Sequence, residues 1–330
     1  MVLAALLVAA AILRSAGYDV TGAGIALWRG ALGSSSAVIS ATLKRATPFL
    51  FLGLAVAVAF RAGVLNIGAD GQFLAGGAAA VAAGLAMAGQ PASVTIPTEL
   101  AAGALGGAAW AAIAAWLRSR FEVAEVVSTL LLNMVAVNLV GFLVRGPMQE
   151  PTHAYPQSGI LPHSARLPSL VAGEQLHWGF IAALCACAFA AWSFNGTAAG
   201  FRAKAVGLNP SAAESAGRIS VARVRAIALI TSGAIAGVAG FSEVTGVTYA
   251  LYEGLSPGYG YMAIAVALLG ALQPTGIVVA AVFFGALNAG ADAAQRDAGI
   301  PAATASVIAG LVILGVVTTP ELHRQFRRDS

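Results

Sequence analysis

NGTAAGFRAKAVGLNPSAAESAGRISVARVR, residues 195–225, is a polar segment between two long apolar parts of the chain. No other internal segment gathers so many basic residues, which are Arg202, Lys204, Arg218, Arg223 and Arg225. Short loops rich in Lys and Arg stay on the cytoplasmic side of a membrane protein. We therefore expect residues 195–225 to form a cytoplasmic loop of a protein that crosses the membrane several times.

The centre of this loop is predicted to form a short helix over residues 210–216. Asn209 suits the N-cap, Pro210 suits the first helical position, and Gly217 suits the C-terminal stop. A capped helix on the cytosolic face would offer a docking surface to a soluble partner. A solvated loop whose charge only sets the topology would also fit, and spacing alone leaves both interpretations open.

The composition supports the membrane assignment. Of the 330 residues, 58% are hydrophobic and only 10% are charged, with a mean hydropathy of +0.82, whereas soluble domains carry about 25% charged residues. The net charge of +4 does not indicate a nucleic-acid partner, because the basic residues lie at the ends of apolar runs, where topology explains them. We expect one all-α polytopic domain, residues 1–330, surrounded by membrane lipid.

About ten membrane spans are predicted, and several are shorter than the roughly 20 residues that a crossing helix needs. The first apolar run, residues 2–13, is either an unusually short helix or the end of a helix that begins before this sequence. The other spans are predicted at residues 47–60, 72–87, 99–117, 126–144, 177–194, 226–247, 261–272, 276–290 and 302–318. With residues 195–225 inside, both termini are cytoplasmic and residues 145–176 form an external loop.

Glycines indicate close packing of these helices. The chain has 39 glycines, and the pairs Gly103/Gly107 and Gly233/Gly237 have the small-xxx-small spacing inside predicted spans. Small residues line helix interfaces in membranes, because they let the backbones approach closely. The pattern predicts a tight helical bundle without separating a transporter from an intramembrane enzyme.

Residues 61–72, RAGVLNIGADGQ, interrupt the apolar pattern with Asn66, Asp70 and Gln72 among glycines. Segments of this kind form the discontinuous helices that face a transport pathway, and an ionisable group near lipid is a functional-site hypothesis by default. The alternatives are that Asp70 caps a helix beginning near Gln72, or that the segment is a conformational hinge.

Other polar residues within spans are weaker candidates. Asn133, Asn138 and Glu243 are more often interhelical hydrogen-bond partners than ligand contacts, although each is a candidate for the pathway. Cys185 and Cys187 face different sides of one helix, so neither a disulfide nor a metal pair is expected. The four histidines show no metal-ligand spacing.

The chain has no nucleotide-binding loop of its own. A P-loop needs G-x-x-x-x-G-K-[ST], and neither Lys44 nor Lys204 lies in that pattern. An ATP-driven permease would therefore need another polypeptide to bind ATP. The competing classes are an ion-coupled transporter, for which Asp70, Glu243 and Asp292 could serve, and an intramembrane hydrolase. For a hydrolase, Ser232 and the histidines offer no His-Ser or Asp-Asp constellation. Neither class needs a capped docking helix in the central loop.

Four blocks carry a family resemblance: RAGVLNIGADGQFLAGG (61–77), EVVSTLLLNMVAVNL (125–139), FRAKAVGLNPSAAESAGRIS (201–220) and GYGYMAIAVALLGALQPTGIVVAAVFFGAL (258–287). In this order they strongly resemble the membrane permease subunit of nucleoside-type ABC importers, within the ribose and branched-chain amino acid permease group. The resemblance covers about residues 42–317. It departs at the N-terminus and at Gln273-Pro274, which puts the role of that turn in doubt.

The resemblance implies that residues 207–217 form a coupling helix, which docks into a cytosolic ABC ATPase. The coupling residues would be Gly207, Asn209, Pro210, Ala212, Ala213, Glu214 and Gly217. It further implies two pseudo-related halves, residues 42–144 and 226–318, around a central pathway. The expected partners are a second permease subunit, either a paralogue or a second copy, and an external solute-binding protein. The chain would be a transport subunit in the cytoplasmic (inner) membrane, not an enzyme, and would hold no cofactor.

The expected substrate is a nucleoside, with a ribose-like sugar or a branched-chain amino acid as the alternatives. The block that contains Asn66, Asp70 and Gln72 looks more like nucleoside permeases than like the others. Neutral amides can meet hydroxyls and ring nitrogens, whereas an amino acid carboxylate would favour a mid-span Lys or Arg, and none is present. The pathway candidates are Asn66, Asp70, Gln72, Asn133, Asn138 and Glu243.

Overall fold

The computed structural model describes residues 2–15, 17–215, 219–300, 307 and 310, and their regular elements are all helices. The first part of the chain forms α1 (Val2–Ser15), α2 (Val20–Leu32), the π-helix η1 (Ala37–Leu43), α3 (Lys44–Arg61), α4 (Ala69–Ala86), α5 (Ala92–Phe121) and α6 (Glu125–Arg145). The second part forms η2 (His163–Ala165), α7 (Gly179–Gly196), α8 (Ala198–Leu208), α9 (Pro210–Ser215), α10 (Val221–Glu243), the π-helix η3 (Val244–Thr248), α11 (Tyr259–Leu269) and α12 (Pro274–Ala298). The expected all-α class is confirmed.

Six helical segments of the described chain are long and apolar enough to cross a membrane: Ala37–Arg61, Ala92–Phe121, Glu125–Arg145, Gly179–Gly196, Val221–Thr248 and Pro274–Ala298. Tyr259–Leu269 is a shorter apolar helix. The predicted span at 302–318 lies almost entirely outside the described residues. These findings confirm a membrane fold with several spans, and the count of about ten stays a prediction.

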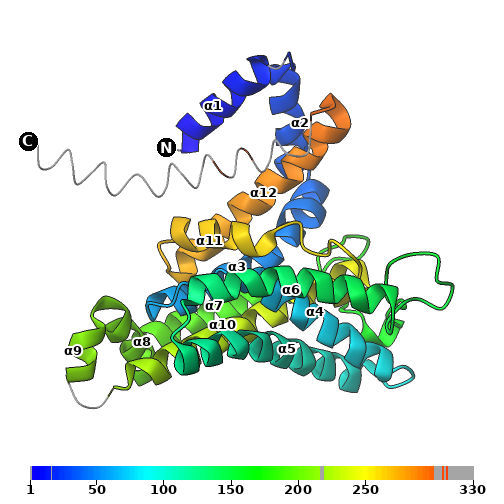
Figure 1. Cartoon of the computed structure of the whole chain (residues 1–330). Helices are drawn as coiled ribbons and strands as arrows, with labels where there is room; N and C mark the ends of the chain where they lie inside the picture. The colour runs from blue at the N-terminus through cyan, green and yellow to red at the C-terminus, as the bar shows by residue number, and fades with distance from the viewer. Residues whose placement is uncertain (1, 16, 216–218, 301–306, 308–309, 311–330) are drawn as a thin grey trace, which may run out of the picture.

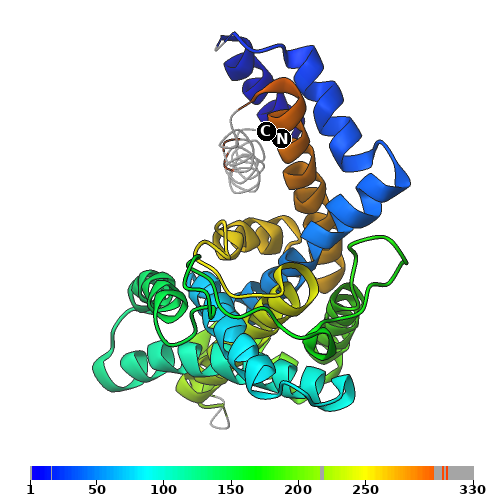
Figure 2. The same ribbon diagram turned by 90° about the vertical axis from the view of Figure 1, so that its right-hand side faces the viewer.

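Two helical regions differ from the sequence prediction. The span predicted to start at residue 47 starts at Ala37, because Lys44 and Arg45 lie inside the helix with their side chains bonded to Gln175 and Asp292. The helix α2 was not predicted, since glycines and Arg29 break its apolar pattern. It packs along α12, and the two helices project from the rest of the bundle (Figures 1 and 2).

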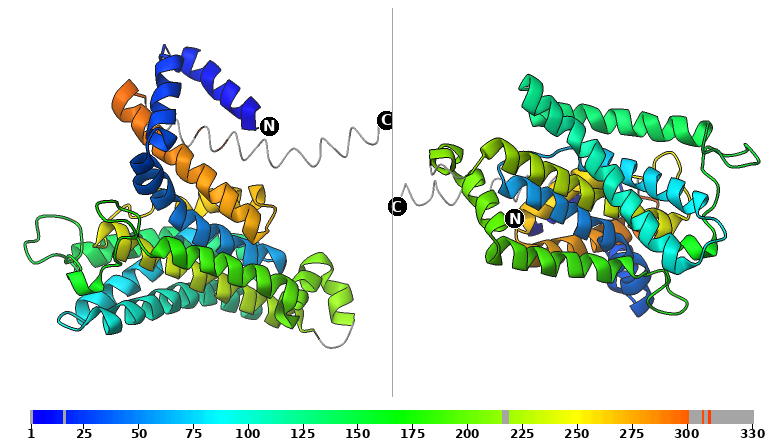
Figure 3. Two further views of the ribbon diagram at one scale, coloured as in Figure 1. Left: turned by 180° about the vertical axis from the view of Figure 1, so that it is seen from behind. Right: turned by 90° about the horizontal axis from the view of Figure 1, so that it is seen from below.

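The bundle is built around α10, which packs against α3, α4 and α5 (Figure 3). The two glycine pairs face each other across the α5–α10 contact. A Cβ added to Gly107 would lie 2.7 Å from Gly237 Cα, and one added to Gly237 would overlap the Gly103 carbonyl. The prediction of close helix packing is therefore confirmed.

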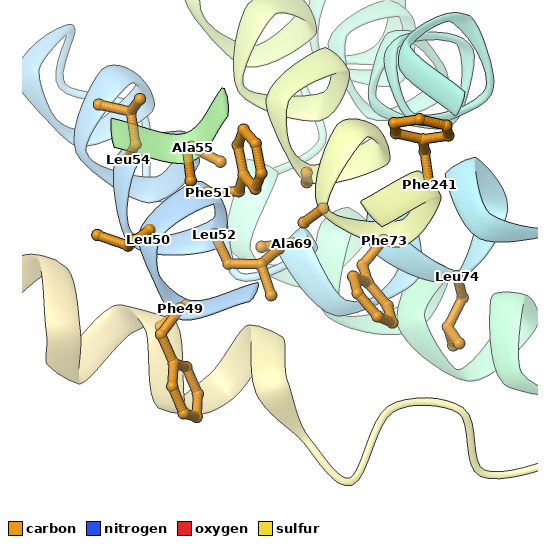
Figure 4. Close-up of a cluster of buried hydrophobic side chains, with 14 of the residues drawn as sticks. Phe49, Leu50, Phe51, Leu52, Leu54, Ala55, Ala69, Phe73, Leu74 and Phe241 are labelled. Atoms are coloured by element: carbon orange, nitrogen blue, oxygen red, sulfur yellow. The ribbon is translucent and has the colours of Figure 1, made fainter. Parts of the chain in front are cut away.

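Helix α3 is the most buried of the spanning segments, and its apolar side chains are enclosed on all sides. Figure 4 shows this core, with Phe49 of α3, Phe73 of α4 and Phe241 of α10. The ring of Tyr259, at the start of α11, meets Phe49 and Phe73 edge to face at centroid distances of 5.4 and 5.9 Å. A helix that is apolar all round belongs in a protein interior, which fits the position of α3 beside α10 inside the bundle.

The segment between α6 and α7 packs on the chain that follows η3. Ser158 N donates to Leu251 O at 2.8 Å, and Leu161 N donates to Tyr249 O at 2.8 Å. His177 closes the segment and is 2% exposed. Burial lowers its pKa to about 4, so the imidazole is neutral at physiological pH.

Candidate functional site

A non-helical stretch separates α3 from α4. Helix α3 ends at Arg61, Gly63 has a positive φ of 72°, and α4 begins at Ala69. Such a φ suits glycine, which has no Cβ to clash. The predicted interruption of the apolar pattern at residues 61–72 is therefore a real break between two helices, and it lies inside the bundle.

Asn66 and Gln72 hold this break together. The Asn66 side chain donates to Gln72 Oε1 at 2.9 Å and to Ser232 Oγ at 2.9 Å, and it accepts from Gln72 Nε2 at 3.1 Å. Ser232 Oγ in turn donates to Ala55 O at 2.6 Å. Both amides are nearly inaccessible. Buried polar groups of this kind are costly unless bonded, so the network fixes the break against α3 and α10.

Asn133 attaches the same break to α6. Its side chain accepts from Gly71 N at 2.8 Å and donates to Ile67 O at 2.9 Å and Tyr261 OH at 3.1 Å. Along α6, Asn133 lies about 12 Å from the start at Glu125 and about 18 Å from the end at Arg145, at 1.5 Å per residue. The polar contacts therefore sit near the middle of a spanning helix.

Asp70 caps a helix other than its own. Its Oδ1 accepts from Gly260 N at 2.8 Å and from Ser256 Oγ at 2.6 Å. Gly260 lies in the first turn of α11 and Ser256 in the loop just before it, where free backbone N–H groups and the helix dipole favour a carboxylate. The N-cap of α4 is Gly68, so the interpretation that Asp70 caps the helix near Gln72 is corrected to a cap on α11.

The remaining pathway candidates lie apart from this cluster. Asn138 is exposed on the outward face of α6, and its side chain donates to Met134 O at 2.8 Å. Glu243 is buried at the junction of α10 and η3, near the charges of Lys44 and Arg45. The structure thus joins Asn66, Gln72, Asn133 and Asp70 around one break and places the other two elsewhere.

Three members of the cluster were not proposed as site residues from the sequence: Ser256, Gly260 and Tyr261. A Cβ on Gly260 would lie 2.5 Å from Asp70 Cα, so only glycine allows this approach. The sequence did offer one sign of them: all three lie in SPGYGY (256–261), which runs into the block 258–287 that carries the family resemblance. No group of three or more His, Cys, Asp or Glu within the described chain could hold a metal ion.

The loop between α7 and α10 contains the predicted short helix. Helix α9 begins at Pro210, and Asn209 Oδ1 accepts from Ala212 N at 3.0 Å, which confirms the expected cap. Ala213 is buried, while Ala212 and Glu214 are exposed. Gly217 lies outside the described residues.

Gly207 joins this loop to the break. It is the second-last residue of α8, and a Cβ added to it would overlap Arg61 O and lie 3.2 Å from Gly63 N. The Arg61 guanidinium lies 4.2 Å from the Phe194 ring and donates to Leu272 O. The base of the loop therefore rests on the turn that leads to Asn66.

A helical membrane bundle with a polar break at mid-depth and a capped helix in a basic loop has the architecture of a membrane permease. The family model described as "Branched-chain amino acid transport system / permease component" matches residues 38–317. The chain belongs to this family of permease components, which are transport subunits rather than enzymes.

Individual permeases of known type are also similar to this chain. The chain is 35% identical over 314 residues to the guanosine ABC transporter permease NupP of Bacillus subtilis, covering 94% of this chain and 89% of that protein. It is 36% identical to the glucose ABC transporter permease TsgB13 of Haloferax volcanii, covering 88% and 78%. It is 32% identical to the nucleoside ABC transporter permease NupB of Lactococcus lactis, covering 93% and 86%.

Proposed function

We propose that the chain is the membrane-spanning permease subunit of an ABC importer, which moves a nucleoside across the cytoplasmic membrane by alternating access. The observation that carries this proposal is the similarity to guanosine and nucleoside permeases over about nine-tenths of the chain. A sugar is the alternative substrate, because the glucose permease is similar to a comparable degree. Asn66, Gln72, Asn133 and Asp70, which we call the mid-depth cluster, surround the break between α3 and α4. The three neutral amides of this cluster favour a ligand with hydroxyls and ring nitrogens.

The mid-depth cluster supplies the proposed pathway through Asn66, Asp70, Gln72 and Asn133, with Asn138 and Glu243 as outlying contacts. In this conformation the amides of Asn66 and Gln72 bond to each other. On opening, they exchange these bonds for bonds to the substrate, so neither state leaves a buried amide unsatisfied. Such an exchange costs little free energy and permits movement between two states.

The full membrane topology belongs to the same proposal. We assign about ten spans in two pseudo-related halves, with both termini and residues 195–225 cytoplasmic and residues 145–176 external. Helix α11 has 11 residues, about half of what a crossing helix needs. A half-length helix that starts at a polar cluster is a feature of transporter folds.

Separate polypeptides complete the proposed importer. A cytosolic ABC ATPase binds the exposed side of α9, with Ala212 and Glu214 at the contact and Asn209 and Pro210 fixing the start of the helix. A second permease subunit, either a paralogue or a second copy, forms the other half of the pathway. An external solute-binding protein delivers the substrate.

Cysteine labelling tests the topology. Ser211 on α9 and Thr152 in the α6–α7 segment are both exposed, and the native cysteines, Cys185 and Cys187, are first replaced by Ala. We expect an impermeant thiol reagent to label Thr152→Cys in intact cells and Ser211→Cys only after the membrane is opened. Labelling of Ser211→Cys in intact cells would overturn the cytoplasmic assignment of the loop.

Co-purification tests the proposed partner. We expect the tagged chain to carry an ABC ATPase subunit through purification in mild detergent. Glu214→Arg should weaken this association and lower ATP-driven uptake about tenfold, which corresponds to a cost of about 1.4 kcal/mol for the reversed charge at the interface. Glu214→Gln, which keeps the shape, is the matched control. If Glu214→Arg recovers as much ATPase and takes up as much substrate as the wild type, Glu214 is not part of the contact.

A further inference from the structure

A pocket of about 590 Å³ lies on the outward face of α6, at the end from which the proposed external segment leaves. Its volume falls within the roughly 300–1,000 Å³ of small-molecule sites. Asn138, Phe142 and Arg145 line it from α6, and Glu253 lines it from the loop between η3 and α11. The pocket is separate from the mid-depth cluster and contains charged, amide and aromatic groups.

The three α6 side chains that line the pocket form a stripe that is too polar for contact with lipid. Asn138, Phe142 and Arg145 are spaced by four and three residues, so they share one face of the helix. Elsewhere the exposed face of α6 is apolar, as at Leu131 and Met134, which are 60% and 58% exposed. Polar and charged groups within spanning helices face water or protein rather than hydrocarbon. The end of α6 that carries this stripe therefore borders water or protein rather than hydrocarbon.

The Glu253 side chain lies close to the backbone at Gly141, which holds the Arg145–Glu253 ion pair in place. Arg145 Nη2 lies 2.7 Å from Glu253 Oε2, and a Cβ added to Gly141 would lie 2.8 Å from Glu253 Oε1. The pair keeps bonding capacity for a ligand, since the Arg145 and Glu253 side chains are 66% and 37% exposed. A carboxylate has two oxygens and accepts several hydrogen bonds, so Glu253 can bind hydroxyl groups while it remains paired.

The pocket is linked by the chain to the mid-depth cluster. Glu253 lies three residues before Ser256, whose hydroxyl donates to Asp70. The same short loop thus carries one wall of the pocket and one partner of the Asp70 carboxylate. A ligand that shifts Glu253 would act directly on the start of α11.

We infer that this pocket is an external recognition site for the nucleoside, an assignment that rests on the proposed function. The base stacks on the exposed ring of Phe142, which offers a flat aromatic face to any base. The ribose hydroxyls donate to Glu253 and bond to the amide of Asn138, and the ion pair with Arg145 orients the carboxylate. The nucleoside then passes along the 253–260 loop to the cluster around Asp70.

The test measures concentration-dependent uptake of radiolabelled guanosine in cells that express the complete importer with variants of this chain. Phe142→Leu keeps an apolar side chain but removes the ring, and we expect it to raise the apparent KM about tenfold, within the range for loss of one base–aromatic stack. Phe142→Tyr keeps the ring and should keep the KM. Phe189→Leu on α7 is the matched control, since Phe189 is also 66% exposed but does not line the pocket.

Glu253→Gln should raise the KM as well, with little change in the maximal rate per inserted molecule. Wild-type uptake with an unchanged KM in Phe142→Leu and Glu253→Gln overturns the recognition site while leaving the proposed function intact. If the wild type takes up glucose but not guanosine, the nucleoside assignment is overturned for both the proposed function and the recognition site. An equal loss of uptake in Phe142→Leu and Phe189→Leu indicates a general packing effect and also overturns the site.

Discussion

Gly207→Val is expected to reduce ATP-driven transport by more than about tenfold while the protein still inserts into the membrane. A Cβ at this position would overlap the carbonyl of Arg61, and the neighbouring atoms are backbone, which cannot rotate away. Overpacking a close contact costs about 1–3 kcal/mol, so the joint between α8 and the turn after α3 must open. The loop that carries α9 then no longer rests on the segment that leads to Asn66.

The measurement is nucleoside uptake together with ATP hydrolysis in membrane vesicles that contain the whole importer. We expect hydrolysis to continue without proportional uptake. Gly24→Val is the matched control, because nothing lies within 4 Å of a Cβ at Gly24. Normal uptake in Gly207→Val would contradict a mechanical role for this contact.

Asp70→Ala should have the other large effect, on both stability and transport. The change leaves the Gly260 N–H in the first turn of α11 and the Ser256 hydroxyl without their acceptor. An unsatisfied buried donor costs about 1–3 kcal/mol, so we expect a lower Tm in detergent and a loss of uptake. An unchanged Tm in Asp70→Ala would contradict the cap.

Asp70→Asn separates the cap from a role for the charge. An Asn side chain still offers one carbonyl oxygen to both donors, so a pure capping role predicts a Tm and uptake close to wild type. Restored Tm with lost uptake would show that transport requires the carboxylate itself.

Local signals in the sequence predicted local structure well. The helix at Pro210 with its Asn209 cap, the break after Arg61 and the close packing at the glycine pairs are all present. Each depends on residues that are neighbours in the chain or on a repeated spacing. Physical rules for caps, helix breaks and small-residue contacts act over such short distances.

The partners of these features were not predictable from one sequence. Asp70 bonds to Gly260, 190 residues away, and Arg45 bonds to Asp292, 247 residues away. A pattern within a window cannot show which distant helix supplies the other half of a contact. For the same reason, Lys44 and Arg45 suggested the end of an apolar run, although in the structure their partners keep them inside one helix.

Uptake by cells with and without this gene tests the central claim most directly. Radiolabelled guanosine, adenosine and uridine are compared with ribose, glucose and leucine, with the partner ATPase intact or inactivated. We predict that nucleoside uptake requires both this chain and the active ATPase, while uptake of the other three compounds is unaffected by loss of the gene. Dependence of glucose, ribose or leucine uptake alone on this gene, or nucleoside uptake that continues without the ATPase, would contradict the account.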